Sequence, residues 1–514
     1  MAAQAWRANP LLYEINTWTW LYGLSERYQR RVTLGSVPDD TLDALAGWGL
    51  DAIWLMGVWE RSPASRKIAS EHPDLQAEYR RALPDFQPGD ISGSPYAIRS
   101  YEVDAYLGGR DELAALRERL AGRNLRLILD FVPNHTSHDA LWLATHPEYY
   151  LHGTERELSA QPDHFFRYPT AAGDIVFANG RDPYYPAWTD TAQLNPFSPQ
   201  LRQQAIATLR DIATQCDGVR CDMAMLVTSE IVVQTWGARA GDPPAEDYWR
   251  EVIPAVKADN PDFLFISEVY WDLEWELQQQ GFDYTYDKEL YNRLHHAPVS
   301  EIRAHLQADL AYQNKLVRMT ENHDEARAAA ALGVPRSLAA AALITTLPGA
   351  TLLHEGQFQG HRVKLPVQLR RRPHENDQPA VEAFYRALLR EATEPIYHGG
   401  DWALRAVEPT TAGDVAHASL IAYTWRLGDE RRVVAINYSD APARGVIRLP
   451  DFALEGQNWT VRDILERAST AGAGAELAQR GLVLELAPWQ AAIFALVPRR
   501  ASVPAPQGDA QRPT

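Results

Sequence analysis

The feature that most constrains the fold is a repeated alternation of short apolar runs with amphipathic helical stretches, which continues for about 390 residues. Runs such as Leu125–Val132 lack polar alternation, which is typical of strands buried on both faces of a parallel sheet. Eight such strand–helix units predict a closed (β/α)8 (TIM) barrel better than an open doubly wound sheet. The other runs are LLYEI from Leu11, Asp51–Met56, Cys216–Met223, Phe263–Tyr270, Gly281–Asp287, Lys315–Asp324 and Gly349–Gly356.

Two connections are too long for ordinary strand–helix loops. One covers about 57–109 and is rich in charge and Pro. The other covers about 137–196, is dense in Pro, Tyr, Phe and His, and has the size of a small subdomain inserted after the third strand. Both emerge at the carboxyl-terminal face of the barrel, where barrel enzymes place their sites.

From about Ile396 the alternation of strands and helices gives way to short strand-like segments separated by turns, such as RVVAINYS and GLVLELAPWQ. These segments predict a terminal antiparallel β-sandwich. The end of the chain is rich in Pro, Ala and polar residues without periodicity, which is typical of disorder. We therefore predict a barrel (1–136 and 197–394), an inserted subdomain (137–196), a sandwich (395–498) and a disordered tail (499–514).

The charge composition argues against two classes of binding partner. Fifty Lys and Arg residues against 67 Asp and Glu give a net charge of −17, which disfavours binding to nucleic acid and to anionic membrane surfaces. The N-terminus has no basic stretch followed by an apolar core, and no run approaches the ~18 apolar residues of a membrane span. We expect a cytoplasmic protein whose two cysteines, Cys216 and Cys221, are reduced core thiols.

Polar side chains follow four of the predicted strands at the point where each strand ends. The third strand ends in DFVPNHT, the fourth in GVRCDM, the fifth at Glu268 and the seventh in NHD, Asn322–Asp324. Because the carboxyl ends of barrel strands converge over one mouth, we expect these side chains to share one site. Arg220 and Asp222 stand two residues apart and therefore lie on the same face of their strand.

Three carboxylates, an arginine and two histidines at one mouth describe a site that cleaves an acetal. One carboxylate attacks the anomeric carbon or stabilises its cation, and another protonates the leaving oxygen. The positive charge of Arg220 is expected to keep Asp222 ionised. Glu268 follows the apolar run FLFIS, so we expect it to be the partly desolvated carboxyl that a general acid requires.

The motifs DFVPNHT, GVRCDMA, FISEVYW and ENHD together resemble the four conserved regions of the α-amylase family (glycoside hydrolase family 13), in the family's order. The resemblance covers about residues 10–495. It implies that Asp222 is the nucleophile, Glu268 the general acid/base and Asp324 the residue that stabilises the transition state. It also implies substrate-binding and supporting residues, which are Tyr96 in GSPYAI, His135, Arg220 and His323 for substrate, and Asp130 and Asn134 for the frame of the site.

Two departures from the family pattern leave the subfamily open. Many members carry Lys-His shortly after the nucleophile, where it serves an acceptor subsite and a calcium ligand, but this chain has Met225 and Leu226. We therefore predict no metal and no cofactor, and a structural Ca²⁺ is the disfavoured alternative. Exo-acting α-glucosidases of the family often follow the stacking Tyr with Asp, where this chain has Ala97.

The predicted function is that of a retaining α-glycoside hydrolase acting on α-linked gluco-oligosaccharides, with α-1,4 as the preferred linkage, through a covalent β-glycosyl intermediate on Asp222. A transglycosylase and an α-glucoside isomerase with the same intermediate are alternatives, and so is a non-catalytic sugar-binding barrel. The expected partner is the oligosaccharide. Linkage, chain length, exo or endo action and oligomeric state stay open.

Each candidate residue also has a structural alternative. An Arg-x-Asp pair can be a buried ion pair, an acid at a helix start can serve the helix dipole, a His can be a hydrogen-bonded core residue, and a Tyr can anchor a loop. The ion pair is the alternative for Arg220 with Asp222, and the helix dipole is the alternative for Glu268. The hydrogen-bonded core position is the alternative for His135 and His323, and the loop anchor is the alternative for Tyr96. Two residues where the insertion rejoins the barrel, Asp190 and Asn195, could contact either substrate or backbone.

Overall fold

The computed structural model describes residues 5–171, 173–456, 458–466 and 469–499. It divides the chain into two compact units, Met1–His398 and Gly399–Thr514. The predicted tail, 499–514, lies outside the described residues apart from Arg499. The predicted limits of the inserted subdomain, 137–196, stay a prediction.

The first unit is built on a closed barrel of parallel strands in the order β1-β14-β13-β12-β11-β10-β5-β2, which confirms the predicted (β/α)8 barrel. All residues of β1 and β14 are buried, as the apolar runs predict for strands covered on both faces. The strands are β1 (Leu11–Asn16), β2 (Ala52–Met56), β5 (Arg126–Phe131), β10 (Gly218–Cys221), β11 (Leu264–Ser267), β12 (Tyr284–Tyr286), β13 (Leu316–Arg318) and β14 (Ala350–His354).

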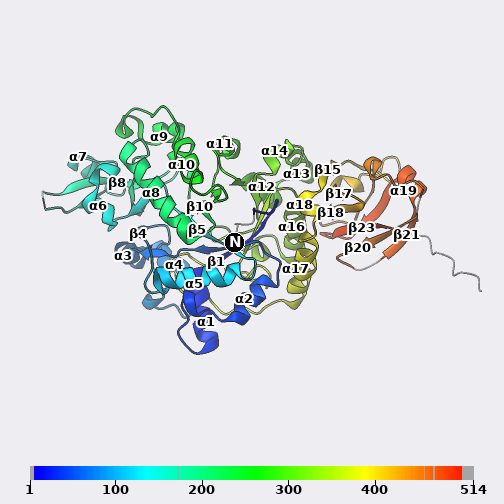
Figure 1. Cartoon of the computed structure of the whole chain (residues 1–514), viewed down its shortest axis with the longest axis horizontal. Coiled ribbons are helices and arrows are strands. Elements are labelled where there is room, and N and C mark those ends of the chain that lie inside the picture. Colours follow the sequence, from blue (N-terminus) through cyan, green and yellow to red (C-terminus); the bar gives the residue numbers. More distant parts are fainter. Residues whose placement is uncertain (1–4, 172, 457, 467–468, 500–514) are drawn as a thin grey trace, which may run out of the picture. The chain divides into compact units, whose positions relative to one another are not determined.

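Helices lie between successive barrel strands and after the last of them (Figure 1). Helix α8 shows how the sequence starts one of them, because the side chain of Ser198 accepts a hydrogen bond from the Leu201 amide and Pro199 occupies the first helical position. The helices are α1 (Thr17–Tyr28), α2 (Asp39–Ala46), α5 (Gly109–Ala121), α8 (Pro199–Gln215), α9 (Ser229–Trp236), α10 (Tyr248–Lys257), α11 (Glu274–Gln279), α12 (Lys288–His296), α13 (Val299–His305), α14 (Leu310–Gln313), α15 (Ala328–Ala331), α16 (Val334–Thr346), α17 (Pro379–Ala392) and α18 (Ile396–Gly399).

The two long connections have secondary structure of their own. The one between β2 and α5 contains an antiparallel pair, β3 with β4, and two helices. The one between β5 and α8 contains a four-stranded sheet in the order β6-β9-β8-β7, and α6, α7 and β8 lie together at one side of the unit (Figure 1). Their elements are β3 (Trp59–Arg61), α3 (Pro63–Glu71), α4 (Pro73–Ala82), β4 (Ile98–Val103), β6 (His135–Ser137), α6 (Leu141–Thr145), α7 (Glu155–Ala160), β7 (Phe165–Tyr168), β8 (Ile175–Gly180) and β9 (Trp188–Gln193).

The second unit is the predicted antiparallel sandwich. A six-stranded sheet, β15-β17-β18-β23-β20-β21, and a three-stranded sheet, β16-β19-β22, enclose one apolar cluster that includes Val433, Ile447, Leu484 and Leu496. The elements are β15 (Asp401–Arg405), β16 (Val407–Glu408), β17 (Leu420–Leu427), β18 (Glu430–Asn437), β19 (Ala443–Ile447), β20 (Asn458–Asp463), β21 (Ser469–Ala473), α19 (Gly474–Arg480), β22 (Leu482–Leu486) and β23 (Ala491–Pro498).

Cys216 and Cys221 are free and buried, as predicted. Among the described residues, no helix is long and apolar enough to cross a bilayer.

Candidate active site

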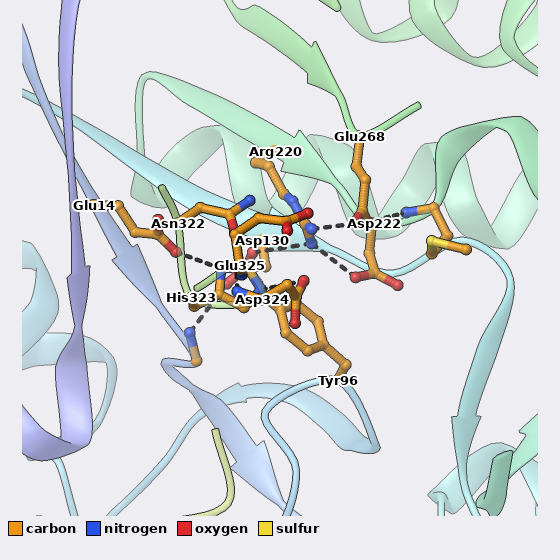
Figure 2. Close-up of polar contacts among 12 residues, drawn as sticks. Glu14, Tyr96, Asp130, Arg220, Asp222, Glu268, Asn322, His323, Asp324 and Glu325 are labelled. Atoms are coloured by element: carbon orange, nitrogen blue, oxygen red, sulfur yellow. Dashed lines mark hydrogen bonds and ion pairs between the residues drawn. The ribbon is translucent and has the colours of Figure 1, made fainter. Parts of the chain in front are cut away.

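The candidate site lies where the polar strand ends meet (Figure 2). Asp222 follows β10, Glu268 follows β11, Asp324 lies in the segment after β13, and His135 opens β6. Together with Tyr96 these side chains line a cavity of about 390 Å³. The other four predicted residues are buried close to them, so all nine come together: Asp130, Asn134, Arg220 and His323.

Arg220 joins the two carboxylates that the sequence assigns to chemistry. Its Nη1 atom lies 2.7 Å from Asp222 Oδ1, and its Nη2 atom lies 2.8 Å from Glu268 Oε2. The guanidinium is 1% exposed, so both contacts form away from bulk water. Register explains the position, because β10 pairs with β5 and β11 and places Arg220 between Asp130 and Ile266. The two carboxyl groups therefore share one planar cation.

The charge state of Asp222 differs from the expectation. Burial is the largest influence on this carboxyl; it raises the pKa from 3.8 to about 7, assisted by the negative charges of Glu268 and Asp324 and opposed by Arg220. The expectation that Arg220 keeps Asp222 ionised is therefore wrong below about pH 7. The sequence identifies the neighbouring cation, but the cost of desolvation depends on the three-dimensional surroundings.

Glu268 is 2% exposed, so it is as desolvated as the apolar run before it predicts. Its carboxyl accepts hydrogen bonds from the Met223 amide (2.6 Å) and from the Tyr270 hydroxyl (2.7 Å). The Met223 amide directly follows Asp222, and Met223 has a positive φ of 42°. The backbone directly after Asp222 therefore binds the carboxyl of Glu268.

Asp324 is linked through His323 to the buried carboxylate of Glu14 inside the barrel. Its Oδ2 atom lies 3.0 Å from His323 Nε2, and His323 Nδ1 contacts the carboxylate of Glu14. Glu14 is fully buried on β1, 309 positions away from His323 in sequence. The second oxygen of Glu14 has no hydrogen-bond partner among the residues that the structure describes. His323 is thus the direct partner of a buried carboxylate.

These contacts set the charges of the three groups. Burial opposes the cationic form of His323, but Asp324 and Glu14 outweigh it and raise the imidazole pKa well above its ordinary value. Desolvation likewise opposes ionisation of Glu14 and Asp324, but His323 outweighs it and lowers both carboxyl pKa values. The histidine is therefore a cation between two anions, and both of its nitrogens donate. The side chain of Asp324 stays 46% exposed toward the cavity.

Tyr96 and His135 form the aromatic part of the wall. The Tyr96 hydroxyl lies 2.8 Å from His323 Nε2, and its ring stacks on the His323 ring at 5.3 Å between centroids. The ring of His135 lies 5.1 Å from that of Trp188, which also lines the cavity. Burial lowers the pKa of His135 to about 4, so this histidine is neutral, in contrast to His323.

Asp130 and Asn134 are held by the protein itself. Asp130 accepts hydrogen bonds from Trp54 Nε1 (3.2 Å) and from the Gly57 amide (3.0 Å). The amide oxygen of Asn134 accepts from Gln193 Nε2 at 2.9 Å, which ties β9 to the barrel. Both side chains therefore bind the frame of the site rather than open cavity.

The two residues left open by the sequence differ. Asp190 lines the cavity and accepts a hydrogen bond from Ser65 Oγ (2.6 Å). The side chain of Asn195 contacts backbone, because it donates to the Ala240 carbonyl (3.1 Å) and accepts from the Phe197 amide (3.1 Å).

Sequence reasoning missed several residues of the site. Glu14 had a readable signal, since it is the charged residue within the apolar run LLYEI. Tyr270 stands two positions after Glu268, but its bond to that carboxyl depends on the turn that follows β11. Trp188 and Gln368 line the cavity from segments without a motif. Lys364 donates to the Asp324 carbonyl from the long segment after β14.

The residues present do not suit the family's calcium ion. A Ca²⁺ site needs six to eight oxygen ligands, but the positions after the nucleophile, where the resemblance implies a calcium ligand, hold the buried apolar side chains of Met225 and Leu226. Within the described ranges, no group of three or more His, Cys, Asp or Glu side chains is placed to hold a metal. The absence of a structural calcium stays a prediction.

Treatment with a chelator such as EDTA is expected to leave the melting temperature unchanged within about 1 °C, because no folding free energy would come from a metal. Differential scanning calorimetry with and without chelator measures this. A fall of several degrees that added Ca²⁺ reverses would contradict the prediction.

Comparison with known proteins identifies the family of the chain. The family model of the α-amylase catalytic domain matches residues 39–391. The chain is 24% identical to α-amylase MalA of Haloarcula japonica, over 70% of this chain and 45% of the relative. It is 22% identical to α-amylase 3 of Dictyoglomus thermophilum, over 53% of this chain and 55% of that relative. It therefore spans about half the length of these curated relatives.

Among solved structures, the fold is similar to that of a maltogenic α-amylase, AmyB of Thermotoga neapolitana, with a TM-score of 0.67 and 19% identity over 95% of this chain and 99% of that one. The match of the family model covers more than half of the chain and includes the strand ends that carry Asp222, Glu268 and Asp324. The chain therefore belongs to the α-amylase family of glycoside hydrolases, glycoside hydrolase family 13.

Proposed function

We propose that this protein is a retaining α-glycoside hydrolase that acts on α-linked gluco-oligosaccharides, with α-1,4 as the preferred linkage. The observation that carries the proposal is the pairing of Asp222 and Glu268 on the single guanidinium of Arg220, beside a cavity that Asp324 also lines. Retaining glycosidases hold their two carboxyl groups about 5–5.5 Å apart, whereas inverting ones leave room for a water molecule between them. Two carboxylates on adjacent nitrogens of one cation favour the retaining spacing.

The first step divides the work between these two groups. Ionised Asp222 attacks the anomeric carbon and forms a carbon–oxygen bond while the glycosidic bond breaks. Glu268 gives its proton to the departing oxygen, so the leaving sugar departs neutral. The product is a β-glycosyl ester on Asp222, and Glu268 is left as a carboxylate. Burial supports the attack, because a carboxylate that has lost its hydration shell is a more reactive nucleophile.

The second step reverses the roles. Glu268, now the base, removes a proton from a water molecule, whose oxygen attacks the anomeric carbon and breaks the ester to Asp222. Two inversions leave the product with the α configuration of the substrate. An acceptor sugar in place of water would give transglycosylation by the same chemistry.

Asp324 and His323 suit the oxocarbenium-like transition state. Asp324 presents a carboxylate to the cavity, and the cationic His323 beside it holds that carboxylate ionised and oriented. We propose that Asp324 accepts hydrogen bonds from sugar hydroxyls, while His323, whose two nitrogens face Glu14 and Asp324, keeps that carboxylate in place. The Tyr96 ring packs beside them as a wall for the same sugar.

A product profile tests the proposal. Purified enzyme is incubated with maltose through maltoheptaose, isomaltose, sucrose, trehalose and starch, with Asp222→Asn as the blank. Shorter α-1,4 products released first as the α anomer are expected. Products longer than the substrate would show that the enzyme is a transglycosylase rather than a hydrolase, and an isomeric disaccharide would show that it is an isomerase. Release of the β anomer would contradict the retaining mechanism.

The substitution Glu14→Gln is expected to move the alkaline limb of the kcat/KM profile to lower pH by about one unit or more. Glu14 and Asp324 both raise the pKa of His323, so removal of one negative charge lets the imidazole lose its proton at lower pH. The positive charge that holds the substrate-binding carboxylate of Asp324 ionised and oriented then disappears, while Gln still fills the space of Glu14. Kinetics across the pH range and an NMR titration of the His323 ring measure the shift.

The matched control is Glu274→Gln, which removes an equally buried carboxyl (3% exposed) from α11, outside the site. It is expected to leave both the profile and the His323 titration as in the wild type. An unchanged His323 titration in the Glu14 variant would show that Glu14 only contributes to folding.

A further inference from the structure

A second cavity, which we name the basic cavity, shares a wall with the catalytic one. It has a volume of about 700 Å³, and its lining includes Arg61, Arg66, Lys67, Asp104, Tyr106 and Arg370. Helix α3 separates the two cavities in part, because Ile68 and Ala69 line the catalytic cavity and Arg66 and Lys67 line the basic one. A volume of this size suits a small-molecule ligand.

The basic cavity concentrates positive charge in a chain whose net charge is −17. Its four cations are Arg61, Arg66, Lys67 and Arg370, and within the described part of the chain none of them forms an ion pair with a carboxylate. The adjacent Arg371 shows the contrast, since it pairs with both Asp85 (3.1 Å) and Asp90 (2.7 Å). The carboxylate that lines the cavity, Asp104, accepts from the backbone amides of Arg61 (3.1 Å) and Tyr106 (2.8 Å) instead.

Arg61 is the unusual member, because it is only 7% exposed. Its Nη1 atom donates to Ser92 Oγ (3.2 Å) and to backbone carbonyls, whereas Nε and Nη2 have no hydrogen-bond partner among the described residues. Burial lowers its pKa to about 10, although the charge of Asp104 opposes this. Among the residues that the structure describes, Arg61 forms no ion pair, and its charge is offset only in part by Asp104 and by the Trp18 ring, whose centre lies 5.0 Å from Cζ. The field of Arg61 acts through an interior of low dielectric on whatever occupies the cavity.

Other sources of binding at this cavity are already occupied. The Tyr106 ring stacks on Trp18 at 4.8 Å, and the guanidinium of Arg31 lies 5.2 Å from the Tyr106 ring centre. Its faces are therefore not a free platform for a sugar ring. The first turn of α3 is satisfied by Ser62, which accepts from the Ser65 amide, and by Asp139, which accepts from the Ala64 amide. What the cavity offers to a ligand is an excess of positive charge, four cations without ion pairs against one carboxylate, among the described residues.

We propose that the basic cavity binds a small phosphate-bearing anion, with Arg66, Lys67 and Arg370 contacting its oxygens and the charge of Arg61 beneath them. Phosphate matches this donor set, because guanidinium and ammonium groups bind its oxygens through charge-assisted hydrogen bonds. Inorganic phosphate and a phosphate monoester of a sugar share this chemistry. The cavity is larger than phosphate alone requires, so it has room for the ester.

Isothermal titration calorimetry of the full-length wild-type protein, without glycoside substrate, tests the proposal. The probes are inorganic phosphate, glucose 1-phosphate and, as the uncharged comparison, glucose. We expect saturable binding of the phosphate-bearing probes and none of glucose. Tighter binding of glucose 1-phosphate than of phosphate would assign the site to the ester, and equal binding would assign it to free phosphate. No binding of either phosphate probe would overturn the proposal.

Variants locate the binding. Arg66→Ala/Lys67→Ala removes two exposed cations of the cavity and should weaken binding about tenfold or more. Lys315→Ala/Arg390→Ala removes two exposed cations outside its lining and should bind as the wild type does. Equal affinity of the first pair and the wild type would refute this location. Because no turnover is measured, these outcomes are independent of whether the protein is a glycosidase.

Discussion

Replacement of Asp222 by Asn should lower kcat/KM on malto-oligosaccharides by roughly 10⁴-fold or more, because the amide cannot form the glycosyl ester. Asn keeps the size of the side chain and an oxygen that can accept from Arg220 Nη1. The measurement is initial-rate kinetics by reducing-sugar release, with mass spectrometry of the quenched enzyme to detect the ester in the wild type. Appreciable residual turnover of a freshly purified variant would refute the assignment of the nucleophile.

The same variant tests the charge of Asp222 through stability. Burial raises the folded-state pKa of this carboxyl from 3.8 to about 7. Ionisation is therefore disfavoured in the folded state, and the wild type loses free energy of unfolding as the pH rises from about 4 to 7. Asn does not ionise, so Asp222→Asn should be more stable than the wild type above pH 7, with a difference that vanishes toward pH 4. Denaturant unfolding at several pH values measures this, and equal stability at pH 8 would contradict the raised pKa.

Replacement of Glu268 by Gln should lower kcat/KM on malto-oligosaccharides by about 10³-fold or more and should affect an aryl glucoside with a good leaving group far less. The natural leaving sugar needs a proton, which Gln cannot supply, whereas a phenolate such as dinitrophenolate departs without one. The amide oxygen of the new side chain can still accept from the Met223 amide and the Tyr270 hydroxyl, so the geometry around the position is kept. Parallel kinetics on the two substrates measure the difference.

Two comparisons make the Glu268 result specific. Glu274→Gln removes another buried carboxyl and should lose activity on neither substrate. Added azide should restore turnover of the aryl glucoside by Glu268→Gln, because azide attacks the glycosyl ester without a general base. Equal losses on both substrates would mean that Glu268 is not the acid.

Much of the site could be predicted from the sequence because it depends on local rules. The period of two of an extended chain places Arg220, on β10, and Asp222, directly after β10, on one face, and parallel strands end at the same side of a barrel. Asp222, Glu268 and Asp324 therefore had to approach one another once the barrel was recognised, and the structure places them around one cavity. The apolar run before Glu268 likewise determined that its carboxyl is buried.

The sequence by itself determined the barrel, the sandwich and the residues at the strand ends, because apolar periodicity and strand polarity are properties of neighbouring positions. Only the tertiary structure decided the charges of those residues. Glu14 reaches His323 across 309 positions, burial raises the pKa of Asp222 despite Arg220, and Arg61 is enclosed without a carboxylate partner among the described residues. Charge states depend on distance and desolvation in space, and no pattern along the chain measures either of them.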